Sequence, residues 1–291
     1  MILEIWTILN PIIRTFIYVT AFYSIGLVIF KVHFDKFFNE EINFYCKKII
    51  RNSAFLGLMI SILAFLSVAG NLGGEIDSIF QIDLIALSFE TMQGKSYLLL
   101  IVGFSILCFS YYIRNNFMSI SNIIGTILIL ISFIVIGHSL SQGIYTQILL
   151  FIHLFCISYW LGSFFPLRHM CNTENFENLY LIAHNFGVYA TFYLGLLIIT
   201  GLTYSYFLLG GVLPIITSTY GNVLSCKILL VSFILMIGAI NKFKIVPNIK
   251  ANLTLGQSKL KRSINIEFIC TWLILFLTSI LTTSLSTPMG M

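Results

Sequence analysis

Long apolar runs separated by short polar links dominate this chain. A helix needs about 20 mostly apolar residues to cross the hydrocarbon layer, because its backbone polar groups must be satisfied internally. Eight runs meet this requirement, covering residues 11–31, 52–70, 96–113, 119–137, 145–166, 180–208, 221–241 and 263–285. The pattern therefore predicts an all-α, polytopic membrane protein with eight transmembrane helices.

The polar links leave no room for a separate globular domain. Residues 213–221 and 242–262 are expected to be loops. Residues 76–90, by contrast, alternate apolar and acidic positions, which predicts a short amphipathic helix lying at the membrane interface.

Composition and charge agree with this topology. Of 291 residues, 58% are apolar and only 9% are charged, too few charges for a soluble domain of this size. Loops rich in Lys and Arg stay on the cytoplasmic side. Thirteen of the sixteen basic residues fall on one side, namely Lys31, Lys36, Lys47, Lys48, Arg51, Arg114, Arg168, Lys242, Lys244, Lys250, Lys259, Lys261 and Arg262. Both termini are therefore expected to face outward. The protein as a whole is expected to contact membrane lipid and to have no nucleic-acid partner.

Short matches divide the chain into two similar halves, residues 1–143 and 144–291. Four spans return the chain to its starting side, so the two four-helix halves would be parallel repeats. The matches are YSIG at 23–26 with YWLG at 159–162, TMQG at 91–94 with STYG at 218–221, and HSLS at 138–141 with TSLS at 283–286.

Two histidines break the correspondence between the halves. His153 aligns with Ile17, and His138 aligns with Thr283. His138 ends the fourth span on the outer side, and His153 lies about 10 Å inside the fifth span at 1.5 Å per residue. The two imidazoles are therefore expected in the same outer leaflet, as additions to a common scaffold.

Sulfur donors accompany these histidines. Cys156 and Trp160 follow His153 on one helical face. Imidazole with soft sulfur suits Cu(I), or Zn(II) with more ligands. The outer side also carries three thioethers, Met92, Met289 and Met291. These residues are metal-site candidates, and the alternative is that His153 only forms a hydrogen bond between helices while the methionines have no role.

Three further charged residues need an explanation inside the membrane, where an unpaired charge costs roughly 2.5–3.5 kcal/mol. They are Arg14, Lys227 and Glu267. Arg14 and Lys227 are expected near an outer vestibule. Glu267 is expected to pair with Lys242, Arg262 or Asn241. The alternative for Arg14 and Glu267 is that their side chains extend to the interface.

Four segments, in this order, resemble the CopD-type copper-resistance membrane proteins. They are IGHSLSQG at 136–143, IHLFCISYWLGSFFPL at 152–167, TSTYGNVLSCKILLVSFILMIGAINKFKIVP at 217–247 and KRSINIEF at 261–268. The resemblance implies an eight-span inner-membrane protein associated with copper movement or tolerance. It implies that His138 and His153 face copper, and that the matching scaffold or pathway residues are Trp160, Gly162, Tyr220, Gly221, Lys227, Asn241 and Glu267.

The chain departs from the family pattern at two points. His184 stands where an Arg is usual, and no periplasmic copper-binding domain is attached. A separate periplasmic copper-binding protein is therefore an expected partner. The residues leave open the oxidation state of the ion, Cu(I) or Cu(II), and the direction of its movement.

The leading hypothesis is thus a copper-transport or copper-resistance membrane protein. The chain has no G-x-x-x-x-G-K-[ST] motif, so the expected driving force is a gradient or a partner. No arrangement of nucleophile and base indicates an enzyme. Two alternatives remain: an assembly factor that delivers copper to a cuproenzyme, and a b-type cytochrome with haem bound by His138 and His153.

Overall fold

The computed structural model describes residues 5–112, 116–137, 143–172, 176–211 and 213–285, and all regular structure in these ranges is helical. Within them, seven helices are long and apolar enough to cross a membrane. The predicted fourth span corresponds to a shorter apolar helix, Met118–Ile134. The protein is thus an all-helical, multi-pass membrane protein.

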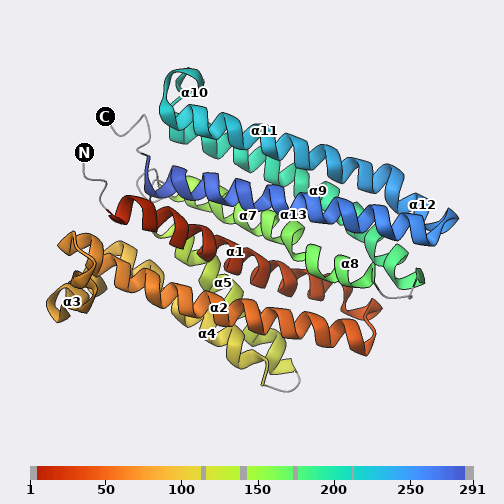
Figure 1. Ribbon diagram of the computed structural model, residues 1–291, viewed down its shortest axis with the longest axis horizontal. Coiled ribbons are helices and arrows are strands. Elements are labelled where there is room, and N and C mark those ends of the chain that lie inside the picture. The colour runs from red at the N-terminus through yellow and green to blue at the C-terminus, as the bar shows by residue number, and fades with distance from the viewer. Residues whose placement is uncertain (1–4, 113–115, 138–142, 173–175, 212, 286–291) are drawn as a thin grey trace.

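Eight long helices form the bundle (Figure 1). They are α1 (Ile5–Phe34), α2 (Glu40–Gly73), α4 (Met92–Ser110), α5 (Asn116–Ile134), α7 (Ile144–Gly162), α9 (Phe176–Leu209), α11 (Thr219–Ile240) and α13 (Leu253–Thr283). The short elements are η1 (Asp35–Phe37), η2 (Asp77–Phe80), α3 (Ile82–Glu90), α8 (Phe164–Met170), α10 (Pro214–Thr217), a π-helical segment η3 (Asn241–Ile245) and α12 (Val246–Ala251).

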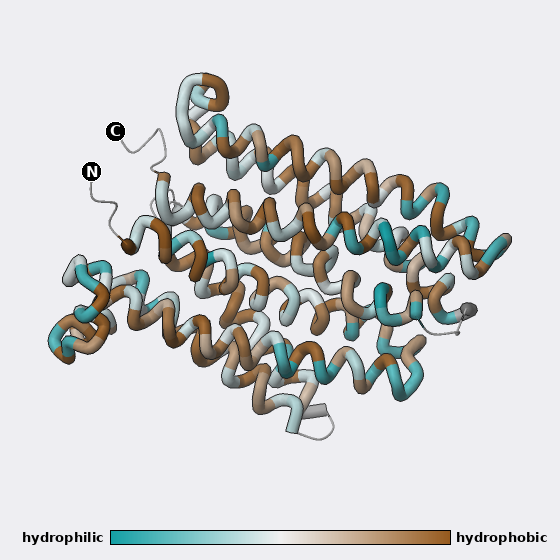
Figure 2. The backbone as a smooth tube through the Cα atoms, in the orientation of Figure 1, coloured by the Kyte–Doolittle hydropathy of each residue, from teal (hydrophilic) through white to brown (hydrophobic). Residues whose placement is uncertain are grey.

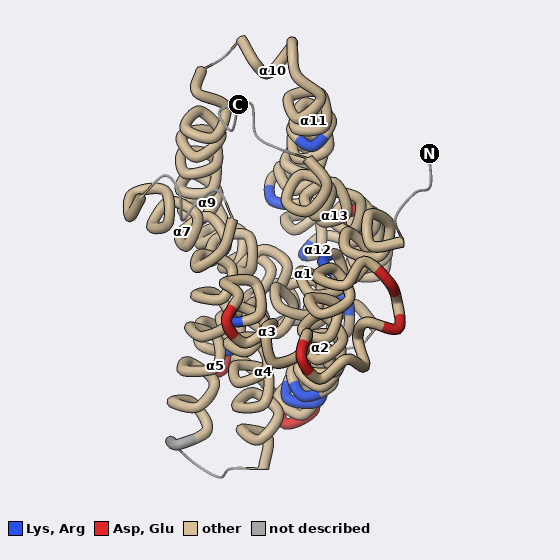
Figure 3. The backbone as a smooth tube through the Cα atoms, turned by 90° about the vertical axis from the view of Figure 1, so that its left-hand side faces the viewer, with Lys and Arg blue, Asp and Glu red and all other residues tan. Residues whose placement is uncertain are grey.

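The long helices alternate in direction, so that α1 begins and α13 ends at the same end of the bundle (Figure 1). We call this the terminal end; α3 and α10 lie there too. The opposite end carries α8 and α12 and is here called the basic end. Hydrophilic segments gather at the basic end and around α3 in Figure 2, and acidic residues of the α2–α3 region lie toward the viewer in Figure 3.

Helix α1 forms the centre of the bundle. Of the residues in its most apolar 18-residue stretch, 83% are buried, a larger share than in any other candidate span. It packs against α2, α7 and α13. Most lipid-facing surface is therefore left to the other helices, as expected for a polytopic protein whose central helix is screened by its neighbours.

The closest helix crossing joins α1 to α7 through two glycines. A Cβ on Gly26 would lie 2.0 Å from the Ser158 carbonyl oxygen, and one on Gly162 would lie 2.0 Å from the Gly26 backbone. Small residues of this kind let two backbones approach within van der Waals contact. The crossing thus brings together the last residues of YSIG and YWLG.

The starts of α4 and α11 share a second local geometry. The side chains of Thr91 and Ser218 accept hydrogen bonds from the backbone N–H groups of Gly94 and Gly221, each at 2.9 Å. This is the usual N-cap arrangement. A Cβ on either glycine would collide with carbonyl oxygens of the preceding short segment, α3 or α10. TMQG and STYG therefore form the same cap.

Two sequence expectations about links have different outcomes. The amphipathic segment 76–90 is helical, as η2 and α3. The prediction that residues 242–262 form a loop is wrong, because η3, α12 and the first turns of α13 occupy this stretch. Asn252 caps α13 by accepting from the Leu255 N–H. The basic residues of segment 242–262 thus lie on helices that extend beyond the apolar span. Hydropathy alone does not detect such extensions.

Candidate functional site

His153 lies on α7 with its imidazole against α9. Its Nδ1 donates to the Leu197 carbonyl oxygen at 3.2 Å. Because a carbonyl can only accept, the proton is on Nδ1 and the lone pair of the neutral ring is on Nε2. Metal-binding histidines usually have their other nitrogen held in this way. The same hydrogen bond also fits the alternative interpretation, in which His153 only forms a hydrogen bond between two helices.

Gly201 of α9 makes room for the ring. A Cβ at this position would lie 2.9 Å from His153 Cε1. Lys227 of α11 is an electrostatic neighbour of the imidazole. Three helices, α7, α9 and α11, therefore meet around His153.

The sulfur candidates are in different places. Cys156 is 2% exposed on α7, one turn beyond His153, and lies near Tyr193 of α9. Met92 is 53% exposed at the start of α4, which packs against α2, α3 and α5. Cys156 is thus on the same α9-facing side as His153, whereas Met92 belongs to the other half of the bundle.

Three predicted donors, His138, Met289 and Met291, lie outside the described residues. Within the described ranges, no group of three or more His, Cys, Asp and Glu side chains is placed to hold a metal ion. All six cysteines are free thiols. The metal site proposed from sequence stays a prediction, and its described candidates are His153, Cys156 and Met92.

Arg14 lies inside the bundle toward the terminal end. The residue is 6% exposed. Its Nε donates to the Tyr18 hydroxyl at 3.2 Å, and its guanidinium carbon is 5.1 Å from the Tyr18 ring centre and 5.3 Å from that of Phe133. Aromatic faces stabilise a cation in such positions. Arg14 therefore does not extend its charge to the interface.

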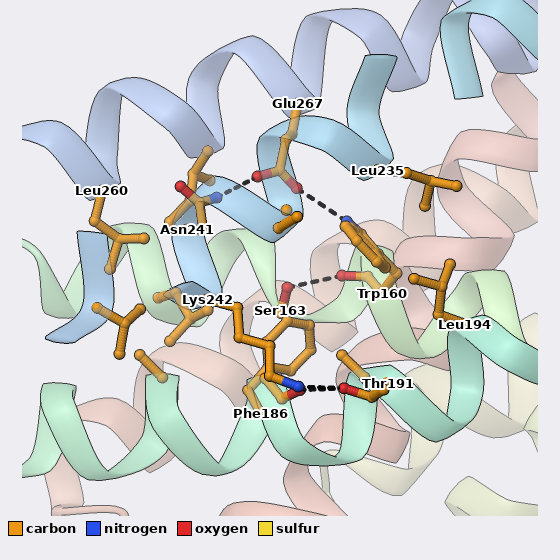
Figure 4. A pocket seen from close by; sticks show the side chains of 18 of the residues that line it. Trp160, Ser163, Phe186, Thr191, Leu194, Leu235, Asn241, Lys242, Leu260 and Glu267 are labelled. Atoms are coloured by element: carbon orange, nitrogen blue, oxygen red, sulfur yellow. Dashed lines mark hydrogen bonds between the residues drawn. The ribbon is translucent and has the colours of Figure 1, made fainter. Parts of the chain in front are cut away.

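Glu267 lines a cavity of about 180 Å³ toward the basic end. We call this the inner cavity; its walls come from α7, α8, α9, α11, η3, α12 and α13. Trp160 Nε1 donates to Glu267 Oε2 at 3.0 Å, and Asn241 Nδ2 donates to Oε1 at 2.6 Å (Figure 4). Of the partners expected for Glu267, Asn241 is the one observed. Trp160 supplies the second hydrogen bond.

Lys242 also lines the inner cavity but does not pair with Glu267. Its ammonium donates to the Thr191 hydroxyl on α9 (Figure 4). Thr191 and Phe243 line the cavity and are exposed, so it reaches the surface between α9 and η3. The carboxylate is thus deep in the cavity and the ammonium lies near its mouth.

Backbone features position this cavity. A Cβ on Gly238 would lie 2.6 Å from the Trp160 ring, so the glycine lets the indole lie across α11. The π-helical turn begins at Asn241 and changes the directions of Asn241 and Lys242. Such turns are frequent at functional sites. Sequence reasoning missed Thr191 because a threonine on a lipid-facing helix has no distinctive pattern around it.

Comparison with known proteins supports the resemblance found from the sequence motifs. Residues 181–281, about a third of the chain, match the family CopD, described as copper resistance protein D. The matched segment contains α11, most of α9 and most of α13, and hence Leu197, Lys227, Asn241 and Glu267. No curated protein and no solved structure matches the chain.

Proposed function

We propose that this chain transports copper ions across the bacterial inner membrane and thereby confers copper resistance or copper supply. The observation that carries the proposal is the match of residues 181–281 to copper resistance protein D. The helical bundle supports it, because seven described helices are long and apolar enough to span a membrane, and the matched segment comprises one of them and most of two others.

The proposed copper site lies in the outer leaflet. His153 offers Nε2, because Nδ1 is held by the Leu197 carbonyl oxygen. We propose that His138 supplies the second imidazole, with Cys156 and the methionines Met92, Met289 and Met291 as weaker candidates. The ion is the cargo, so ligands that hold it without binding irreversibly suit the function.

We propose the positive-inside orientation, with both termini outward and eight spans in two parallel halves. Two contacts support the duplication: Gly26 against Gly162, and the matching caps of Thr91 and Ser218. We further propose that a periplasmic copper-binding protein delivers the ion and that the chain is not an enzyme.

Copper flux into membrane vesicles of known orientation tests this function. Flux is expected in the parent and is expected to fall by roughly tenfold or more in His153→Ala and His138→Ala, since loss of even a supporting group costs 10–100-fold at metal sites. His184→Ala is the matched control, because His184 is exposed and its ring stacks on Tyr180.

The outcomes separate the alternatives. Equal flux in the parent and both outer-leaflet variants would refute the site. Absence of copper flux in the parent, together with a cuproenzyme left without metal when the chain is deleted, would favour the assembly factor. A Soret band in the purified protein would favour the cytochrome instead.

A further inference from the structure

The inner cavity holds a carboxyl group that has no basic partner. Glu267 is 4% exposed, and in the described part of the chain no Lys, Arg or His lies within ion-pair distance of it. Lys242, the basic residue that lines the same cavity, bonds to Thr191. A negative charge buried without a cation is costly, and a proton removes that cost.

The two hydrogen bonds to Glu267 are not equivalent. Trp160 Nε1 is a donor only, so it always requires an acceptor oxygen on Glu267. Asn241 carries both a donor and an acceptor on one amide. As described, its Nδ2 donates to Glu267, and its Oδ1 is buried without a partner among the described residues. Figure 4 shows this oxygen turned away from the carboxylate.

This unpaired oxygen is explained if Glu267 alternates between two protonation states. When Glu267 is ionised, Asn241 must present its NH₂ and leave its oxygen unpaired. When Glu267 is protonated, its O–H can donate to the oxygen of a turned amide, and the NH₂ then faces the other way. Both states keep the Trp160 bond, so a change of protonation requires only the amide to turn.

The cavity also marks a difference between the two halves. In the first half, Phe104 of α4 fills the space beside Gly57 of α2. The corresponding helices of the second half, α9 and α11, approach each other at few backbone positions, and the inner cavity lies between them toward the basic end. A second cavity, lined by Arg51, Phe55 and Cys108, lies between α2 and α4, but no described acidic residue lines it, so Glu267 is the acidic group with cavity space beside it in this comparison.

We infer that Glu267, with Asn241 and Trp160, is a proton-binding site that exchanges protons through the inner cavity and couples copper movement to a proton gradient. A hydronium ion at the cavity mouth transfers its proton to a Glu267 oxygen, so that one O–H bond breaks, one forms and water is left; release reverses this step. Oxygen donors of this kind suit a proton better than Cu(I), which prefers sulfur and imidazole. The coupling rests on the proposed copper transport; the proton site itself does not.

Few other titratable groups of the described residues face this site. Lys242 lines the cavity from η3, Cys270 lies one turn further along α13, and Tyr23 of α1 stacks on Phe268 beside Glu267. Among the described lining residues from α7, α8, α9, α11 and α12, none is Asp, Glu, Lys, Arg or His. A pH response of the cavity is thus assigned to Glu267, with Lys242 as the group to test separately.

Infrared spectroscopy of the protein in membranes tests the proton site without copper. The parent is expected to show a carboxylic-acid C=O band that disappears as pH rises, and Glu267→Gln is expected to lose it. Glu267→Asp should keep a shifted band, while Lys242→Gln should shift its midpoint without removing it. Glu40→Gln, which changes an exposed carboxylate at the basic end, is the matched control and should keep the band.

Glu267→Gln is expected to fold, because its amide oxygen can accept from Trp160 and its NH₂ can donate to a turned Asn241. Thermal unfolding of the purified variant checks this. A parent that lacks the band, or a band that persists in Glu267→Gln, overturns the proton site. If Glu267→Gln does not fold, the shifted band of Glu267→Asp decides instead.

Proteoliposomes that contain an internal pH indicator, loaded with Cu(I), test the coupling. In the parent, copper flux should move protons, and a pH difference of one unit should change the steady-state copper ratio roughly tenfold for one proton per ion. In Glu267→Gln this ratio should no longer follow pH. Copper flux that moves no protons in the parent overturns the coupling and leaves the copper function intact. A titrating band without any copper flux overturns the copper function instead, and with it the coupling, but keeps the proton site.

Discussion

At the scale of single residues, most partners of the polar groups inside the bundle lie on other helices. His153 bonds to the Leu197 carbonyl oxygen, and Glu267 accepts from Trp160 and Asn241. Arg14 lies against two aromatic rings, Phe133 of α5 and Tyr18, which is one turn further along α1. Residue type and depth could therefore be predicted, whereas the partner depended on packing.

Gly201→Ala tests whether the position of the His153 ring matters for copper. The new Cβ would lie 2.9 Å from Cε1, so the ring must shift and weaken its bond to Leu197. Copper affinity is expected to fall roughly tenfold, as for other losses of ligand support. Competition with a coloured copper chelator measures this.

Gly195→Ala is the control for this substitution. It lies on the same helix, and a Cβ there would have no atom within 4 Å. Equal copper affinity in the two alanine variants would show that the ring position has no role in binding.

At the scale of helices, two pairs of matched tetrapeptides in the sequence correspond to defined contacts in the structure. The matched tetrapeptides YSIG and YWLG meet at the crossing of α1 and α7, and TMQG and STYG form equivalent caps. Apolar runs located every long helix of the described residues but began several of them too late. Helix α13, for example, begins at Leu253, ten residues before its apolar run, because polar and basic residues can continue a helix in water beyond the apolar span.

Gly26→Ala tests the crossing of α1 and α7. A Cβ 2.0 Å from the Ser158 carbonyl oxygen forces the two helices apart. Overpacking of this kind costs about 1–3 kcal/mol, so the free energy of unfolding in detergent should fall by that amount. Gly195→Ala should leave it equal or slightly higher, because alanine favours helix over glycine. A Gly26→Ala protein as stable as Gly195→Ala would contradict the described contact.

At the scale of the whole molecule, the eight long helices of the described residues alternate in direction and place the start of α1 and the end of α13 at one end (Figure 1). Most Lys and Arg residues belong to helix ends and short elements of the opposite end. This arrangement agrees with the orientation that the positive-inside rule predicts. It also gives the two sites different surroundings, with His153 in the half toward the terminal end and the inner cavity toward the basic end.

Reporter fusions test the orientation. A reporter that is active only outside the cytoplasm, fused after Met291, should be active, and the same reporter inserted after Lys250 in α12 should be inactive. A cytoplasmic reporter at both positions should give the opposite result. Activity of the outer reporter at Lys250 and its absence after Met291 would reverse the proposed orientation, and equal activity at both positions would contradict a membrane crossing by α13.

The sequence by itself determined the class of molecule, an all-helical protein with several helices long and apolar enough to cross a membrane, because the cost of exposing backbone and charge to hydrocarbon is set by composition along the chain. It also identified His153 and Glu267 as groups that need an explanation. The tertiary structure decided which atoms meet them. Three-helix contacts put Gly201 and Leu197 beside His153, and the π-helical turn at Asn241 brought its amide to Glu267 while directing Lys242 to Thr191. Such contacts depend on helix rotation and tilt to within about an ångström, and no periodicity in the chain specifies them.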